Sequence, residues 1–126
     1  MTSGKNKPFR CKPRIRIMAG DSIALGPGKI DLLEAIQRQG SISQAAREIK
    51  LSYRRAWDMV DTMNHCFKKP LVISSTGGKG GGGAQLTPLG NRMILLYRSM
   101  ESSAEASTQS EWKTIKRFLK QPQDSL

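Results

Sequence analysis

The pattern of apolar and polar positions predicts three short helices in the first half of the chain. After Lys29 the apolar residues recur every third or fourth position, which is typical of an amphipathic helix, and this pattern stops before Gly40. A second helix follows at once, with Ser41 as its N-cap and Gln44 at capping-box spacing. The positions expected to face the core are Ile30, Leu32, Leu33, Ala35 and Ile36 in the first helix, and Ile42, Ala45, Ala46 and Ile49 in the second.

A third helix is predicted to begin after Ser52, whose side chain can cap it. Its apolar stripe, expected to lie in the core, consists of Ala56, Trp57, Val60, Met63 and Phe67. The opposite face carries Tyr53, Arg54, Arg55, Asp58 and Asp61. A helix rich in small residues, a short turn and a helix with a basic start are together typical of a helix-turn-helix motif.

Two pairs of short strands are predicted on either side of these helices. Arg14 to Met18 alternate, turn residues follow, and an apolar run resumes at Ile23 to Leu25, which predicts a β-hairpin. Leu71 to Ser74 and Ala84 to Leu86 enclose a loop dominated by glycine, Thr76 to Gly83, which predicts a second hairpin. Placed directly after a helix-turn-helix, such a hairpin is a wing.

A longer helix is predicted after Thr87 and Pro88, which supply a cap and a first-turn proline. An apolar seam with spacings of three and four follows, and we expect it to join two copies of the chain; an alternative is that it binds another regulator. The pattern is compatible with one helix to Lys120 and also with a break in the polar stretch 107–110. The predicted dimerisation residues are Leu89, Met93, Leu96, Met100, Ala104, Ile115 and Leu119.

These elements divide the chain into four segments. Residues 1–13 are polar, basic and interrupted by proline, which predicts a poorly ordered arm. Residues 14–87 form the expected winged helix-turn-helix domain, mainly α with a small β component, residues 88–120 the dimerisation helix, and residues 121–126 a tail. A chain of 126 residues with 37% apolar residues can bury one modest core, so no additional sensor or catalytic domain is expected.

Charge adds an expectation about the partner. The formal net charge is +11, from 21 Lys and Arg against 10 Asp and Glu, and an excess of this size favours polyanions. Two stretches contain no Asp or Glu: the residues before Asp21 and those between Asp61 and Glu101. This predicts a basic surface that follows nucleic-acid phosphates. The alternative is that the first stretch is a solubilising tail and the second a solvated face. Membrane binding is not expected, because the densest basic stretch lacks a bulky apolar face and the apolar runs are too short for a bilayer.

The remaining chemistry argues against catalysis and cofactors. Cys11 and Cys66 lie far apart without the spacing of a disulfide framework, which indicates reduced thiols and a cytoplasmic location. His65 stands beside Cys66, but no second cluster supplies the further ligands that a metal needs. His65 is also the only histidine, so no nucleophile and base can be paired. We therefore expect neither an enzyme nor a bound metal or cofactor.

The start of the third helix carries the side chains expected to contact double-stranded DNA. The second helix of a helix-turn-helix enters the major groove, where each base pair shows a distinct pattern of donors and acceptors. An arginine there can bind guanine in two places, and Asp58 could accept a hydrogen bond from cytosine. Contact with phosphate or solvent alone is the alternative for the arginines. The candidates are Ser43 and Gln44 from the second helix, and Ser52, Tyr53, Arg54, Arg55 and Asp58.

The glycine-rich loop offers a further anion contact, because bare backbone amides can surround an anion. The nucleotide-binding loop requires Ser or Thr after Gly-Lys, whereas Lys79 is followed by Gly80. A Gly-x-x-Gly match from Gly77 to Gly80 leaves open a clamp for single-stranded RNA, and a plain flexible turn is another alternative. We expect a wing tip in which Lys79, flanked by Gly78 and Gly80, approaches the minor groove or the phosphates of a duplex.

Taken together, these residues resemble the DNA-binding domain of ModE-type molybdate-responsive regulators, within the LysR-like winged helix group. The resemblance implies a homodimeric transcription regulator that reads a palindromic operator. Known members of that family carry C-terminal molybdate-binding domains, and because this chain stops at Leu126 we expect molybdate not to bind it directly. The matching segments, within Ile15 to Met100, are Gly40-Ser-Ile-Ser-Gln-Ala-Ala, Ser52-Tyr-Arg-Arg-Ala-Trp-Asp, Asn64, Thr76-Gly-Gly-Lys-Gly-Gly-Gly-Gly-Ala and Leu86-Thr-Pro-Leu-Gly.

Overall fold

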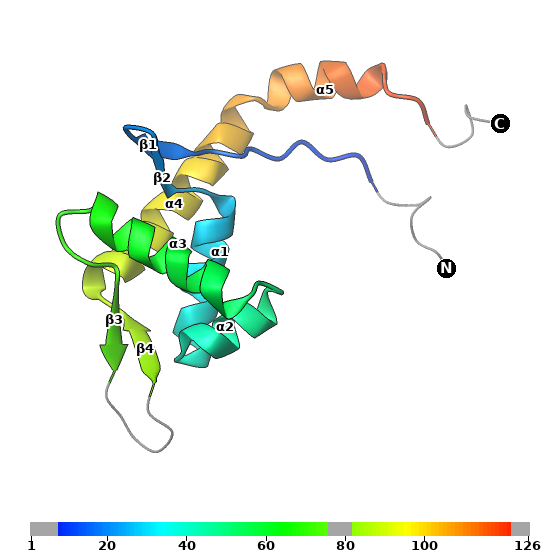
Figure 1. The fold of residues 1–126 in the computed structure, drawn as a ribbon. Coiled ribbons are helices and arrows are strands. Elements are labelled where there is room, and N and C mark those ends of the chain that lie inside the picture. Colours follow the sequence, from blue (N-terminus) through cyan, green and yellow to red (C-terminus); the bar gives the residue numbers. More distant parts are fainter. Residues whose placement is uncertain (1–7, 76–81, 122–126) are drawn as a thin grey trace. The chain divides into compact units, whose positions relative to one another are not determined.

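The part of the chain that this computed structural model describes, residues 8–75 and 82–121, contains two hairpins and five helices (Figure 1). The elements fall into two units, one of residues Arg14–Ser99 and the other of Met1–Pro13 with Met100–Leu126. Both hairpins, the three short helices and the start of the fourth helix belong to the first unit. In chain order the elements are β1 (Ile17–Ala19), β2 (Ser22–Leu25), α1 (Pro27–Gln39), α2 (Ile42–Glu48), α3 (Tyr53–Cys66), β3 (Val72–Ser75), β4 (Gly83–Leu86), α4 (Pro88–Ser107) and α5 (Gln109–Arg117).

Helix α1 begins at Pro27, earlier than the predicted start at Lys29. Proline suits the first helical position, because the N–H there has no partner within the helix and the ring holds φ near its helical value. The helix ends where the pattern predicted. Gly40 has a left-handed φ of 74°, and its N–H donates to the carbonyl of Ile36 at 2.8 Å. Glycine adopts that conformation without strain, so α1 stops there.

Serine caps begin α2 and α3, as the sequence predicted. The Oγ of Ser41 accepts a hydrogen bond from the N–H of Gln44 at 3.1 Å, and the Oγ of Ser52 accepts one from the N–H of Arg55 at 3.1 Å. Each bond satisfies a backbone donor that the first helical turn leaves without a partner. The caps therefore determine where α3 starts, and with it which side chains stand in its first turn.

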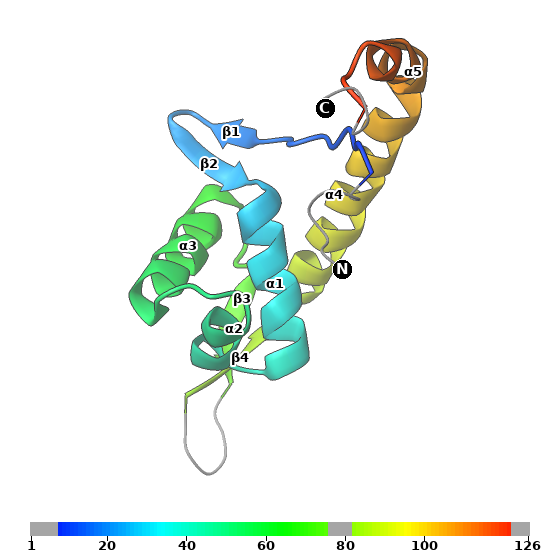
Figure 2. The same ribbon diagram turned by 90° about the vertical axis from the view of Figure 1, so that its right-hand side faces the viewer.

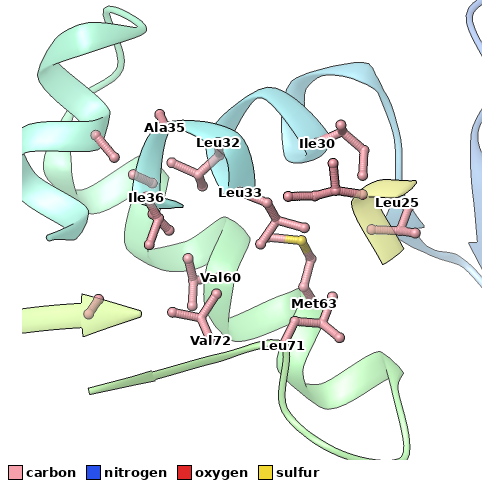
Figure 3. Packing of buried hydrophobic residues seen from close by; sticks show 14 of the residues in the cluster. Leu25, Ile30, Leu32, Leu33, Ala35, Ile36, Val60, Met63, Leu71 and Val72 are labelled. Atoms are coloured by element: carbon pink, nitrogen blue, oxygen red, sulfur yellow. The ribbon is translucent and has the colours of Figure 1, made fainter. Parts of the chain in front are cut away.

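The core of the Arg14–Ser99 unit lies between α1, α3 and the second hairpin. Leu33 of α1, Met63 of α3 and Leu71 are fully buried and pack in one cluster (Figure 3). Burying a side chain of this size contributes about 1.5–3 kcal/mol, so the cluster holds α3 firmly on α1. Small residues at the inner positions let the helices approach closely, and they are buried too: Ala45, Ala46 and Ala56.

A polar contact outside the core links the ends of α1 and α2. Arg38 donates two hydrogen bonds to the Glu48 carboxylate, and Gln39 donates one at 2.9 Å. The bond from Arg38, followed by that from Gln39, lowers the pKa of the Glu48 carboxyl below its usual value. Because the contact is exposed, it contributes more to the orientation of α2 than to stability.

Asn64, in the last turn of α3, holds the start of the second hairpin. Its Oδ1 accepts hydrogen bonds from the N–H groups of Leu71 at 2.8 Å and Val72 at 3.2 Å, and its Nδ2 donates to the carbonyl of Val72 at 3.0 Å. Leu71 and Val72 are buried, so no water replaces these bonds. A single side chain thus joins β3 to the end of α3.

Thr87 and Gly90 hold the other strand of this hairpin. The Thr87 N–H donates to the Leu71 carbonyl at 2.9 Å, its hydroxyl donates to the Pro70 carbonyl at 2.8 Å, and its Oγ1 accepts from the Gly90 N–H at 3.0 Å. A Cβ on Gly90 would collide with the carbonyl oxygen of Leu71. The segment Leu86-Thr-Pro-Leu-Gly therefore begins α4 and closes the hairpin at the same time.

Helix α4 packs on the core through Gly90, Ile94 and Tyr97. Tyr97 is 1% exposed, and its hydroxyl donates to the carbonyl of Ile15 at 2.6 Å, just before β1. Ile94 and Tyr97 do not belong to the apolar seam predicted from the sequence. That seam runs one position earlier along the helix, through Met93 and Leu96.

The last helices are separate, with the break at Thr108. The Thr108 hydroxyl donates to the carbonyl of Ala104 at 2.9 Å, and the side chain of Gln109 donates to that of Glu105 at 3.2 Å. Side-chain bonds of this kind compete with the helical ladder, which explains why the polar stretch interrupts the helix. Of the two possibilities left by the sequence, the structure has the break. Within residues 8–75 and 82–121, no helix has the length and apolar character to span a bilayer.

Candidate nucleic-acid interface

The outward face of α3 carries an arginine and an aspartate one turn apart. The Arg54 side chain is 86% exposed, and its Nε lies 3.5 Å from Oδ1 of Asp58, whose side chain is 57% exposed. An ion pair this exposed adds little to stability, but it restrains the guanidinium on the outer face of the helix.

Arg55 lies on a different side of α3, and its positive charge acts on Lys29 of α1. Partial burial lowers the pKa of the Lys29 ammonium group below its usual value; Cys66 acts in the opposite direction, and the positive charge of Arg55 lowers it further. Both side chains carry a positive charge, which favours anions on this flank of α3. Lys29 was missed by sequence reasoning, since nothing in the linear pattern shows that α1 starts beside α3.

A groove of about 970 Å³ lies on the other flank of α3, between α2, α3 and the β3–β4 hairpin. Figure 2 shows these elements side by side. The groove brings together three predicted contact residues, Ser43, Gln44 and Tyr53, with two that were not predicted, Trp57 and Ile73. Its full lining is Ser41, Ile42, Ser43, Gln44, Tyr53, Trp57, Val60, Asp61, Asn64, Val72, Ile73, Ser74, Ser75, Gly82, Gly83 and Ala84.

The prediction that Trp57 lies in the core is wrong. Its side chain borders the groove and the residue is 45% exposed. The buried positions of α3 are Ala56, Val60 and Met63, which recur at helical spacing. Trp57 follows Ala56 directly, so it lies about 100° further around the helix, beyond the stripe that α1 covers. Only the packing of α2 and β3 decides that this flank stays open.

The base of the wing is attached to the end of α1 and to the end of α3. The N–H of Ala84 in β4 donates to the carbonyl of Gly40 at 2.9 Å, while Asn64 holds β3. In the hairpin Val72 pairs with Leu86 and Ser75 with Gly83. The predicted wing-tip contacts lie outside the described residues: Gly78, Lys79 and Gly80.

The predicted dimerisation residues have different surroundings. Leu89 and Met93 are partly buried against the core of their own unit. Other apolar residues in and just after the last two helices are exposed, including Leu95, which was not predicted. The exposed fractions are 72% for Leu95, 47% for Leu96, 43% for Met100, 56% for Ile115, 84% for Phe118 and 37% for Leu119. Ala104 is half-buried.

The titratable side chains around α3 are not arranged as a metal centre. Within the described residues, no three His, Cys, Asp or Glu side chains are grouped as ligands. The Nδ1 of His65 lies 2.8 Å from the carbonyl oxygen of Asp61 in its own helix. Cys66 is a free thiol next to it in the sequence.

Comparison with protein families and known proteins places these elements in context. Residues 28–91, just over half of the chain, match the bacterial regulatory helix-turn-helix proteins of the lysR family. The matched residues run from the first turn of α1 to the first turn of α4, and so include α2, α3 and the wing.

The chain is also similar to curated proteins. The molybdenum transport protein ModE of Azotobacter vinelandii is 51% identical over 78 residues, 62% of this chain and 29% of that protein. The molybdenum-pterin-binding protein MopB of Rhodobacter capsulatus is 45% identical over 91 residues, 72% of this chain and 34% of that protein. The DNA-binding transcriptional dual regulator ModE of Escherichia coli (strain K12) is 51% identical over 71 residues, 56% of this chain and 27% of that protein. The chain thus spans about a third of these relatives or less, and the predicted resemblance to ModE-type regulators is confirmed.

The fold is also found among solved structures. The crystal structure of the CbnR DBD in complex with DNA has a TM-score of 0.55 at 16% identity, and covers 70% of this chain and 95% of that chain. The predicted winged helix-turn-helix architecture is therefore confirmed.

Proposed function

This chain belongs to the bacterial regulatory helix-turn-helix proteins of the LysR family, and from that premise we propose that it is a sequence-specific DNA-binding transcription regulator without catalytic activity. The observation that carries the proposal is the exposed first half of α3. Arg54 projects there beside Asp58, on a helix that the core and Ser52 hold in place. An α-helix that is exposed in this way fits into the major groove of B-DNA.

We propose that the side chains around α3 contact different parts of the duplex. Lys29 and Arg55 meet the sugar-phosphate backbone on one side, because both are cations and phosphates attract them. Arg54 contacts base edges, and Ser43 and Gln44 contact the duplex from the exposed start of α2. The wing tip, with Lys79 and its glycine neighbours, follows phosphates or the minor groove.

Selection of bound fragments from random duplexes tests the function directly. We expect one family of sequences to be enriched, and expect the affinity to fall with salt, because released counterions oppose binding. With about six phosphate contacts the slope of log affinity against log salt should be near −5. Affinity that is insensitive to salt, or a pool in which single-stranded RNA competes better than duplex DNA, would contradict the proposal.

We further propose that the protein acts as a homodimer joined through the exposed apolar side chains of α4 and α5. Leu95 and Leu96 support this, since neighbouring exposed leucines on a helix are usually covered by a partner. A symmetric dimer would bind inverted half-sites separated by one or more turns of DNA.

Replacing Leu96 by glutamate should yield monomers in sedimentation velocity, because a carboxylate at an apolar interface loses its hydration without gaining a partner. Gln85→Glu is the matched control, since it adds the same charge on an exposed position of β4. An intact dimer in Leu96→Glu would refute the proposed interface.

A further inference from the structure

The groove beside α3 has an unusual concentration of exposed apolar side chains. Tyr53 is 56% exposed, Trp57 45% and Ile73 41%, and all three line it. Tyr53 and Trp57 are one turn apart on α3, so they share one flank of the helix. Apolar side chains of this size gathered around one hollow indicate a surface that is covered in the functional state.

The charges of the groove do not suit a phosphate. Among its described lining residues there is no Lys or Arg, and the one charged group is the carboxylate of Asp61. The other polar lining groups are neutral hydroxyls and amides such as Ser43 and Gln44. Anionic oxygens would therefore lose hydration here without gaining a cation, whereas an apolar group would lose nothing.

The position of the groove along α3 identifies the apolar group that a duplex would offer. Tyr53 and Trp57 lie beside Arg54 in the first turns of the helix, on the flank toward the groove, so on a duplex they would lie next to the base pairs that Arg54 contacts. In the major groove, the C5-methyl of thymine is the apolar group that the bases display. Aromatic rings accept such a methyl on their faces or edges without needing a hydrogen-bonding partner.

We propose that Tyr53 and Trp57, with Ile73 on the opposite wall, form a pocket for thymine C5-methyl groups. This inference rests on the proposed function and adds a specificity to it. Arg54 reads guanine by hydrogen bonds, whereas Trp57 recognises thymine by apolar contact, so the operator contains thymines beside the position read by Arg54.

Removal of single methyl groups from the DNA tests this pocket. A site selected from random duplexes with the wild-type protein is synthesised again, with each thymine in turn replaced by deoxyuridine, and affinities are measured by fluorescence anisotropy. At one or more positions the wild type should bind about fourfold more weakly, the effect of one buried methyl group. At those positions Trp57→Ala should bind thymine and deoxyuridine duplexes equally.

Trp112→Ala is the matched control, because it removes the other tryptophan, in α5, and should keep the full sensitivity to deoxyuridine. The wild-type series requires no variant, so the test stands even if a substitution impairs folding. Insensitivity of the wild type at every thymine overturns the inference. The inference is also overturned if Trp57→Ala still binds deoxyuridine duplexes more weakly than thymine duplexes. It is overturned as well if Trp57→Ala loses the same affinity for every duplex, which would indicate that Trp57 packs against deoxyribose. A selection that enriches no sequence would instead refute the proposed function itself.

Discussion

Asn64→Ala should lower the free energy of unfolding by about 3 kcal/mol, because two buried N–H groups lose their acceptor. The Asn64 side chain makes three hydrogen bonds to the backbone of Leu71 and Val72, and these two residues are 0% and 4% exposed. For a domain of this size that corresponds to a melting temperature lower by about 10–20 °C. The melting temperature is measured by monitoring thermal unfolding with circular dichroism.

Two variants separate the hydrogen bonds from general effects of substitution. Asn64→Asp keeps the acceptor for both N–H groups but puts an oxygen against the Val72 carbonyl, which only a protonated carboxyl can bond, so its loss of stability should be smaller than that of Asn64→Ala at acidic pH. Gln85→Ala, on an exposed position of β4, should change the free energy of unfolding by less than about 0.5 kcal/mol. Equal stability of Asn64→Ala and the wild type would mean that the end of α3 does not hold the wing.

The largest effect on function is expected for Arg54→Ala. Loss of a bidentate contact to guanine should weaken binding to the preferred sequence by about 1–3 kcal/mol, or roughly 5- to 150-fold, and binding to random duplexes far less. The side chain is 86% exposed, so the substitution should leave the fold intact. Competition titrations with specific and random duplexes measure the two losses.

Lys79→Ala is the comparison for Arg54→Ala, since a contact to phosphate carries no sequence information and its loss should weaken both kinds of duplex alike. Asp58→Asn adds a second check. It removes the charge that restrains Arg54 at 3.5 Å, and so should lower the ratio of specific to random binding. Should Arg54→Ala and Lys79→Ala show the same uniform loss, base readout would have to lie elsewhere than Arg54.

The start and end signals of the helices were predictable because they depend on near neighbours. Ser41 and Ser52 cap the helices that follow, and Gly40 ends α1, as the sequence indicated. A cap needs only a side-chain oxygen and a backbone N–H three residues later. The start of α1 was predicted two residues late, at Lys29, although Pro27 suits a first helical turn.

The surroundings of α3 were only partly predictable. The pattern placed Arg54 and Asp58 on the outer face, where the structure has them, and their contact with DNA stays a prediction. Trp57 was assigned to the core because the apolar stripe looked broad enough to include it. Which edge of a stripe is covered depends on elements far away in sequence, and here α2 and β3 leave that edge open.

The sequence by itself determined where most helices and strands lie, that a helix-turn-helix and a wing follow one another, and that the charge favours a polyanion. These properties come from local periodicity, turn residues and composition. The tertiary structure alone decided that Asn64 and Thr87 hold the wing, that Tyr97 reaches Ile15, and that Ala84 bonds to Gly40. Each of these depends on a contact between residues that only the packing of the core brings together, and no local pattern encodes such a contact.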